Sequence, residues 1–172
     1  MNRVFALAAL AALASTPAFA GKDPCPGVSQ KKDAFGVTRS FEVGSLKAIR
    51  SGDTTTLVVS INSGGGYGGF SSSGATLVGA GTPVQLMMAD DTLLDLASTA
   101  AVGPTFVNIM GIMVAYIPFP IQLTPEQIAA LSAQPIKAAR SDAGGKSIST
   151  EIKGKDGQKF QETFTCLTTT SL

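Results

Sequence analysis

The sequence contains no histidine. The side chains that could take part in acid–base or nucleophilic catalysis are therefore mainly those with hydroxyl, amine and carboxylate groups. A Ser-His-Asp triad, a Cys-His pair and an ordinary histidine-ligated zinc site are therefore excluded. Hydrolysis without histidine stays open through a serine–lysine couple or through paired carboxylates. The spacing of these residues does not show which of them meet in space, so we assign no catalytic residue and no metal ligand.

Three carboxylates lie close together in the sequence, at Asp90, Asp91 and Asp95. The glycine-containing loop of oxygen ligands that binds calcium is missing around them. We interpret these residues as a solvated loop rather than as an acid–base pair or a metal site. Residues 90–102 as a whole fit either a short helix or a strand with a loop.

Two glycine-rich segments imitate phosphate-binding motifs. Residues 64–69 (GGGYGG) follow a predicted strand and fit the G-x-G-x-x-G pattern, but no helix is predicted after them. Residues 144–147 (GGKS) resemble the end of a P-loop, but a predicted strand follows them, which indicates a turn. We expect no cofactor. Tyr67 and Phe70 remain candidate binding residues at a loop tip, because loops on a rigid scaffold often carry recognition.

The chain has two cysteines, Cys25 and Cys166. Each is the other's only possible partner within the molecule, and an exported protein matures where thiols oxidise. We therefore predict a disulfide that joins the two ends of the mature chain. No Cys-x-x-Cys motif is present, so the cysteines do not indicate a redox function.

The beginning of the chain has the three-part layout of a secretory signal peptide. Arg3 precedes an apolar run over residues 4–13, and the small-residue site Ala18-Phe19-Ala20 follows. We expect cleavage after Ala20, which leaves residues 21–172 as a single globular domain in the periplasm or outside the cell. Because the apolar run is about half the length that spans a bilayer, we expect no transmembrane anchor after cleavage.

The charge of the mature chain excludes some classes of partner. The predicted signal peptide holds one of the 13 basic residues and none of the 12 acidic residues, so the mature chain has a formal charge of zero. Nucleic acids and anionic membrane surfaces attract proteins with a surplus of basic residues. We therefore expect neither as a partner.

The pattern of apolar residues predicts a mainly β or α+β fold, with a single antiparallel sheet or a β-sandwich-like arrangement and one short C-terminal helix. Thr124, Pro125 and Gln127 supply an N-cap, a proline in the first turn and a capping box, and Pro135 ends this helix. Asp156 and Gly157 predict a tight turn between the last two strands. Alternation with a period of two predicts strands at residues 37–43, 54–62, 75–78, 83–88, 147–153 and 159–167.

Residues 105–119 (TFVNIMGIMVAYIPF) carry no charge and are apolar at both odd and even positions. Two interpretations follow: a central strand covered on both faces, or a surface that contacts a membrane or a partner. We predict the covered strand, because prolines limit the segment to fewer residues than a membrane-spanning helix needs and because Val, Ile, Phe and Tyr favour strands.

The run LTPEQIAALSAQPIKAARSD, followed by the predicted hairpin and the last cysteine, resembles the closing segment of small uncharacterised exported bacterial proteins. The resemblance covers about the last third of the chain. It implies export and a single mostly-β domain, and it implies no functional residue.

These observations predict an exported, non-enzymatic binding or interaction module. Its partner would be a protein or a small molecule of the cell envelope. One alternative is a histidine-free hydrolase that uses a serine–lysine or a carboxylate pair. Another is an envelope-associated structural protein that uses residues 105–119 as an apolar contact.

Overall fold

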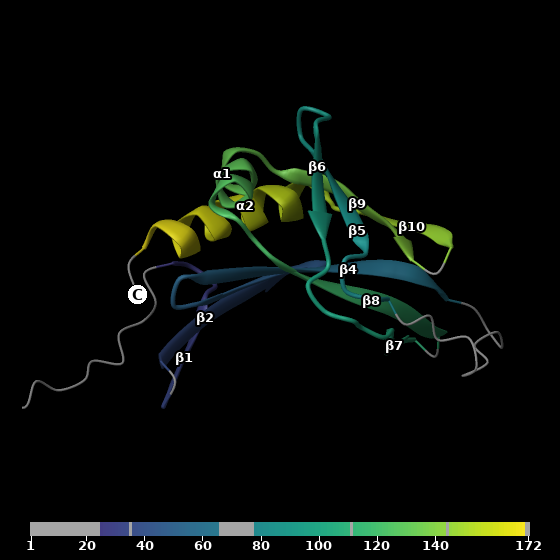
Figure 1. Cartoon of the computed structure of the whole chain (residues 1–172), viewed down its shortest axis with the longest axis horizontal. Coiled ribbons are helices and arrows are strands. Elements are labelled where there is room, and N and C mark those ends of the chain that lie inside the picture. Colours follow the sequence, from purple (N-terminus) through teal and green to yellow (C-terminus); the bar gives the residue numbers. More distant parts are fainter. Residues whose placement is uncertain (1–24, 35, 66–77, 111, 144, 171–172) are drawn as a thin grey trace, which may run out of the picture.

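The computed structural model describes residues 25–34, 36–65, 78–110, 112–143 and 145–170. Within these ranges the chain forms a six-stranded sheet, a four-stranded sheet and two helices, with antiparallel pairing between all neighbouring strands (Figure 1). The prediction of a mainly β fold is confirmed. In spatial order the large sheet contains β1 (Ser29–Asp33), β2 (Gly36–Val43), β3 (Leu46–Ser51), β4 (Thr54–Gly65), β8 (Ile112–Gln122) and β7 (Thr105–Ile109). The small sheet contains β10 (Lys146–Glu151), β9 (Ile136–Ala143), β5 (Pro83–Met88) and β6 (Leu93–Ala97), and the helices are α1 (Pro125–Ala133) and α2 (Gly154–Thr169).

The small sheet and both helices lie on one face of the large sheet (Figure 1). Strand β4 shows why: Leu57, Val59 and Ile61 are buried, and the alternate residues are only half-buried. Burying one face of the large sheet against the second layer produces a single apolar core. The centre of that core is formed by Phe41, Leu46, Leu57, Val59, Ile61, Leu86, Phe119, Leu131, Ile136, Phe160, Phe164 and Leu167.

Several strand predictions are confirmed and others need correction. The predicted strands at residues 37–43, 54–62 and 83–88 correspond to β2, β4 and β5. Strand β3 was not predicted, and β6 assigns a strand to part of residues 90–102. Residues 75–77 lie outside the described residues. Val78 forms a bridge with Val102 rather than a hairpin with β5.

Helix α1 is confirmed together with its cap. The Thr124 side chain accepts a hydrogen bond from the Gln127 backbone, and the Gln127 side chain accepts one from the Thr124 backbone. Pro125 begins the helix, where a missing N–H costs nothing. These local signals placed the start of α1 at the correct residue.

The predicted closing hairpin is wrong, because residues 154–169 form helix α2. Phe160, Phe164 and Leu167 are spaced by four and three residues, and all three are fully buried, which is the stripe of an α-helix. Phe160 and Phe164 are also compatible with a period of two, which is why the pattern at residues 159–167 predicts a strand. The strand at 147–153 is close to the observed β10, but β10 pairs with β9 through the turn predicted at residues 144–147. The fold therefore has a second, longer helix.

Gly157 is the residue that misled the turn prediction. It is buried in α2, and a Cβ added to it would overlap the backbone carbonyl oxygen of Ile136 in β9. The glycine therefore permits the helix to approach the strand closely, and it does not form a turn. At the other end of α2, the Nη1 atom of Arg50 donates to the carbonyls of Leu167, Thr168 and Thr170 at 2.7, 2.9 and 3.0 Å. These carbonyls at a helix C-terminus would otherwise need other donors.

The predicted disulfide between Cys25 and Cys166 is confirmed, with 5.7 Å between the two Cα atoms. It attaches the segment that precedes β1 to the last turn of α2. The Nη2 atom of the buried Arg39 lies 3.2 Å from the Cys25 sulfur. The bond is thus placed at the boundary between the large sheet and α2.

The prediction of one covered strand over residues 105–119 is also wrong. The segment contributes two strands, β7 and the first part of β8, which pair with each other as a hairpin from Thr105↔Tyr116 to Ile109↔Ile112. From Ala115 to Ile121, the inward-facing residues of β8 are buried, and before Ala115 the hairpin is half-exposed or exposed. In the second half of the segment β8 is covered on one face only, because Tyr116 and Pro118 on the other face are half-buried.

Candidate interaction surface

The residues singled out in the sequence do not come together as a site. The predicted signal peptide, Tyr67 and Phe70 lie outside the described residues. Among the residues that the structure describes, no group of three or more Cys, Asp and Glu side chains is arranged to hold a metal ion.

Asp90 and Asp91 lie in the turn between β5 and β6, and Asp95 lies within β6. Asp90 accepts hydrogen bonds from the hydroxyl and the backbone N–H of Thr92 and from the Gln134 amide at the end of α1. These bonds, led by the one from the Thr92 hydroxyl, lower the pKa of Asp90 to about 2. Asp91 forms an ion pair with Lys137 at 2.7 Å, and Asp95 accepts from Gln85 at 2.6 Å. The three carboxylates thus have separate partners, and all three residues are exposed.

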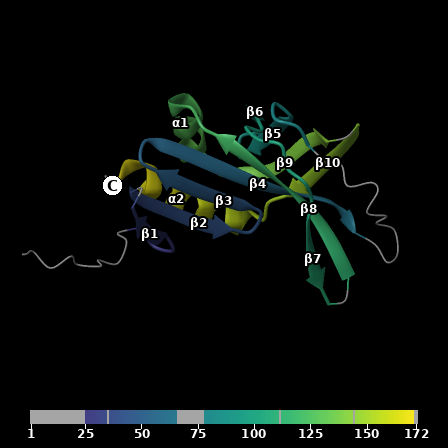
Figure 2. The ribbon, with the colours of Figure 1, turned by 60° about the horizontal axis from the view of Figure 1, so that its bottom comes forward.

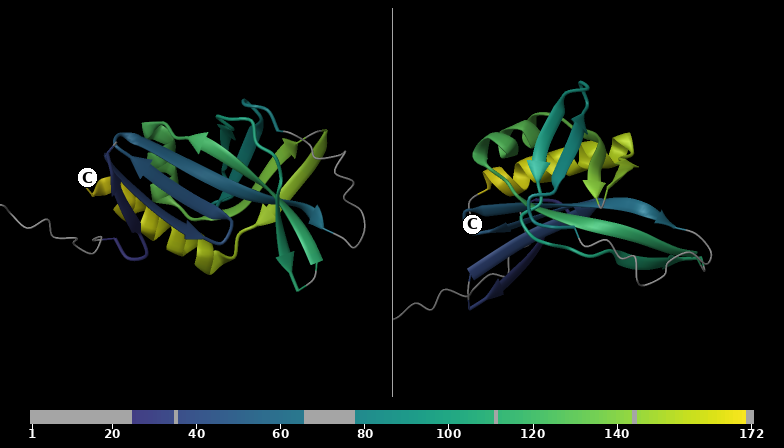
Figure 3. Two further views of the ribbon diagram at one scale, coloured as in Figure 1. Left: turned by 90° about the horizontal axis from the view of Figure 1, so that it is seen from below. Right: turned by 45° about the vertical axis from the view of Figure 1, so that its right-hand side comes forward.

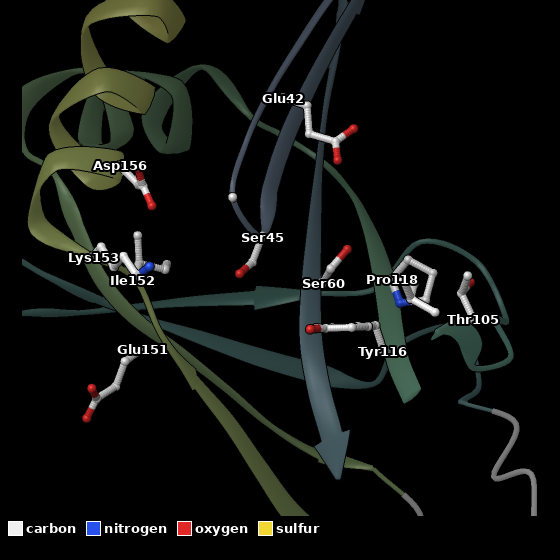
Figure 4. A pocket seen from close by; sticks show the side chains of 12 residues that line it. Glu42, Ser45, Ser60, Thr105, Tyr116, Pro118, Glu151, Ile152, Lys153 and Asp156 are labelled. Atoms are coloured by element: carbon white, nitrogen blue, oxygen red, sulfur yellow. The ribbon is translucent and has the colours of Figure 1, made fainter. Parts of the chain in front are cut away.

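A cleft of about 620 Å³ lies where the turn between β2 and β3 meets the junction of β10 and α2. The pairing of β4 with β3 ends at Val59, and β4 continues beside β8, so the outer surface of β4 and β8 forms one wall. Figure 4 shows the Tyr116 hydroxyl directed from β8 toward the middle of this space. The opposite wall belongs to residues 151–156.

The two walls of the cleft differ in chemistry. One carries Glu151, Lys153 and Asp156, with Glu42 at the rim, and the other is formed by residues of β7 and β8. Ser45 and Ser60 supply hydroxyl groups between them. Within the described part of the chain, no hydrogen bond joins the Lys153 amine to either hydroxyl. The cleft can therefore offer hydrogen bonds and carboxylates to a ligand beside a wall that combines the apolar Val107 and Pro118 with the hydroxyl groups of Thr105 and Tyr116.

The wall formed by β7 and β8 continues into a surface where exposed hydrophobic side chains are concentrated. Eight large hydrophobic side chains are exposed among the described residues, and six of them lie on the β7–β8 hairpin. The ends of β7 and β8 project from the rest of the fold in Figures 2 and 3. We call these six residues the apolar tip: Phe106, Val107, Ile109, Met110, Ile112 and Met113.

The apolar tip is exposed on both faces of the hairpin. Side chains alternate along a strand and directly paired residues share a face. Val107 and Ile109 therefore lie on one face with Ile112, and Phe106 lies on the other with Met113. All five are between 39% and 45% exposed. On both faces of the hairpin these side chains are far more exposed than the core-facing side chains of the large sheet, such as Leu57 and Val59, which are fully buried.

Met110, at the end of the hairpin, is 97% exposed and has a φ of 52°. Glycine, asparagine or aspartate is the common choice for a positive φ, because a larger side chain is strained there by roughly 1–2 kcal/mol. A methionine at this position is therefore unfavourable for the turn and leaves an apolar side chain in water. Its presence is better explained by a contact than by folding.

The cleft and the apolar tip are continuous. Thr105, Val107 and Tyr116 line the cleft, and they belong to the same hairpin whose far end carries the tip. The sequence contains a signal for this hairpin: Asn108 and Gly111 interrupt an apolar run that is longer than an average strand, which argues against a membrane-spanning helix and is also typical of a turn. A turn within the run was the alternative to one continuous strand.

No helix among the described residues is long and apolar enough to cross a membrane. Comparisons of the chain with protein-family models, with curated proteins and with solved structures found no match. The cleft and the apolar tip are therefore the features of the described residues that bear on function.

Proposed function

We propose that the chain is an exported, non-enzymatic interaction module that docks through the apolar tip of the β7–β8 hairpin. The observation that carries this proposal is the concentration of six of the eight exposed large hydrophobic residues on one projecting hairpin. Contiguous apolar surface on a protein commonly marks a contact with a partner or a membrane. The disulfide between Cys25 and Cys166 is compatible with an oxidising compartment, which supports export.

The magnitude of the available burial indicates what kind of docking to expect. Fully burying one large apolar side chain contributes about 1.5–3 kcal/mol. Five tip residues have about two-fifths of their surface left to bury and Met110 has nearly all of it, so the tip could contribute on the order of 6 kcal/mol. Association costs an estimated 4–15 kcal/mol in lost freedom of motion. The tip is therefore an anchor whose binding is weak and reversible unless other contacts are added.

The cleft supplies the position for such contacts. Its carboxylates and hydroxyls begin at the base of the same hairpin, so a partner held by the tip lies next to them. Polar groups around an apolar contact fix its orientation more than they increase its affinity. We therefore assign anchoring to the tip and orientation to the cleft.

Retention of the mature protein on washed cell-envelope membranes tests the proposal. Met110→Asp places a charge on the most exposed tip residue, and aspartate tolerates a positive φ, so the fold should be preserved. We expect this variant to lose most of the retention. Leu93→Asp is the matched control, because Leu93 is 49% exposed on β6, outside the hairpin. Equal retention of the two variants would contradict docking through the tip.

A further inference from the structure

We infer that the surface on which the apolar tip docks is the lipid of a membrane, into which the end of the hairpin inserts at the level of the headgroups. This inference rests on the proposed docking function and names its partner. It concerns electrically neutral lipid, because neither the tip nor the mature chain carries a surplus of positive charge.

Exposure on both faces distinguishes a lipid from a protein partner. A protein interface has an apolar centre and a polar rim, and it usually covers one face of a strand or hairpin. Here Val107 and Ile109 on one face and Met113 on the other are exposed to the same degree. Met110, at the end of the hairpin, is almost fully exposed to solvent. A medium that surrounds the hairpin end matches this distribution better than a groove does.

The absence of charge extends far beyond the tip. The sequence has no Asp, Glu, Lys or Arg between Asp95 and Glu126, which includes the whole of β7 and β8. A charged side chain is among the most costly to transfer into a bilayer. The projecting hairpin therefore carries no charged side chain that would oppose its transfer to the membrane interface, and Asn108 is the one amide side chain on β7.

The length and the pairing of the hairpin limit the depth of insertion. Four residues of β7 from Phe106 to Ile109 span about 13 Å, which is less than half of a hydrocarbon core of about 30 Å. Strand β7 lies at the edge of the large sheet, and an open sheet edge is not stable inside hydrocarbon. The hairpin end should therefore enter only the boundary between headgroups and acyl chains, about 5–10 Å deep.

The base of the hairpin has the residues expected at the water side of such a boundary. Thr105 and Tyr116 form the first pair of the hairpin, about four residues above its end, and tyrosine is enriched at membrane interfaces. The cleft carboxylates Glu42, Glu151 and Asp156 outnumber the one amine, Lys153, next to this pair. We therefore expect anionic lipid to leave binding unchanged or to weaken it.

A single introduced tryptophan provides a direct measurement, because the chain has none. In Met113→Trp the indole replaces a 45% exposed tip residue on β8, and in the control Leu93→Trp it replaces a 49% exposed residue on β6. The probe is vesicles of phosphatidylcholine and phosphatidylethanolamine without protein. We expect a blue shift and protection from aqueous quencher for Met113→Trp and no change for Leu93→Trp. Equal spectra with and without vesicles for both would overturn the inference.

Vesicle flotation with the unlabelled protein separates this inference from the proposed function. We expect Met110→Asp to reduce the floated fraction at least about tenfold and Leu93→Asp to leave it unchanged. Addition of phosphatidylglycerol should not increase flotation. A requirement for phosphatidylglycerol would contradict insertion into neutral lipid, and so would flotation that survives Met110→Asp.

Two further results would reject lipid as the partner while keeping the docking function. In the first, the protein does not float with vesicles, yet it is retained on envelopes in a manner sensitive to Met110→Asp and lost when the envelopes are treated with protease. In the second, sedimentation shows a concentration-dependent dimer that Met110→Asp disrupts, without flotation. The first would assign the tip to an envelope protein and the second to another copy of this chain.

Discussion

Strand β8 passes through two environments, and the contrast between them supports the proposed division of the molecule into a body, which is the part around the apolar core, and a docking element, which is the end of the β7–β8 hairpin. Near its start, Met113 is 45% exposed, whereas Ile117 and Phe119, which follow on the same face of the strand, are 4% and 0% exposed. Both halves are apolar and free of charge. The difference is that the second half pairs with β4 and faces the core, while the first pairs with β7 at the end of the hairpin.

The two edges of the large sheet differ in the same way. Both edge strands, β1 and β7, consist entirely of exposed residues, but β1 has the sequence SQKKD and β7 has the sequence TFVNI. Charges on an exposed edge strand, lysines above all, prevent association with other chains. The edge at β1 has that protection and the edge at β7 has none. This difference supports the assignment of the hairpin as the surface that makes contacts.

The largest expected effect is at Ile117, in the buried half of β8. Ile117→Asp would leave an unpaired carboxylate in the core, which costs several kcal/mol, against a typical total stability of about 5–15 kcal/mol. We expect loss of the cooperative thermal transition, measured by circular dichroism. The control Ile117→Val should cost about 0.5–1.5 kcal/mol. A normal melting curve for Ile117→Asp would mean that the body is not packed as described.

Loss of the disulfide should have the next largest effect, and it should affect the body alone. The bond closes a sequence separation of 141 residues, and removal of a native disulfide from a small domain typically costs about 2–5 kcal/mol. We expect this loss for the double variant Cys25→Ala with Cys166→Ala in guanidinium unfolding at equilibrium. The wild-type protein in reductant should lose a similar amount. A loss below about 1 kcal/mol would show that α2 is held to the large sheet by packing and by Arg50 instead.

The C-terminal part of the chain shows what the sequence could and could not predict. The start of α1 was predictable, because a capping box is a local signal carried by Thr124 and Gln127. Helix α2 was not recognised, because Lys153 provides no side-chain cap and because Gly157 is typical of a turn. The reason for this glycine lies in a distant segment, at the carbonyl of Ile136, which a local pattern does not contain.

Gly157→Ala should have a smaller effect than loss of the disulfide. Alanine favours a helix over glycine by about 1 kcal/mol, so helix propensity alone predicts stabilisation. The added Cβ would instead overlap the backbone of β9, and overpacking of this kind typically costs about 1–3 kcal/mol. We expect net destabilisation in guanidinium unfolding. Gly154→Ala in the same helix has open space around the added Cβ and is the control. If Gly157→Ala were stabilising, the close approach of α2 to β9 would be incorrect.

The candidate site was predictable only as a pair of alternatives. The charge-free composition of residues 105–119 is visible in the sequence, and it permits either a covered strand or a contact surface. Periodicity cannot decide between them, because apolar residues at both parities are expected in each case. The decision depends on which strands lie beside the segment, namely β4 for one half of β8 and β7 for the other. That is a property of the tertiary fold.

The smallest expected effect on stability is at Ile112, and the comparison of the two halves of β8 depends on it. Ile112→Asp makes the same substitution in the same strand as Ile117→Asp. Position 112 lies near the end of the hairpin and on the face of β8 opposite to Ile117, so its carboxylate can reach water. We expect a change of about 1 kcal/mol or less, which is a shift in Tm of less than roughly 4 °C for a domain of this size. Binding to envelopes should decrease strongly, because a charge then lies in the tip. Unfolding of Ile112→Asp, with Ile112→Asn destabilised as well, would show that the hairpin end is packed in the protein, and the division between body and docking element would be wrong.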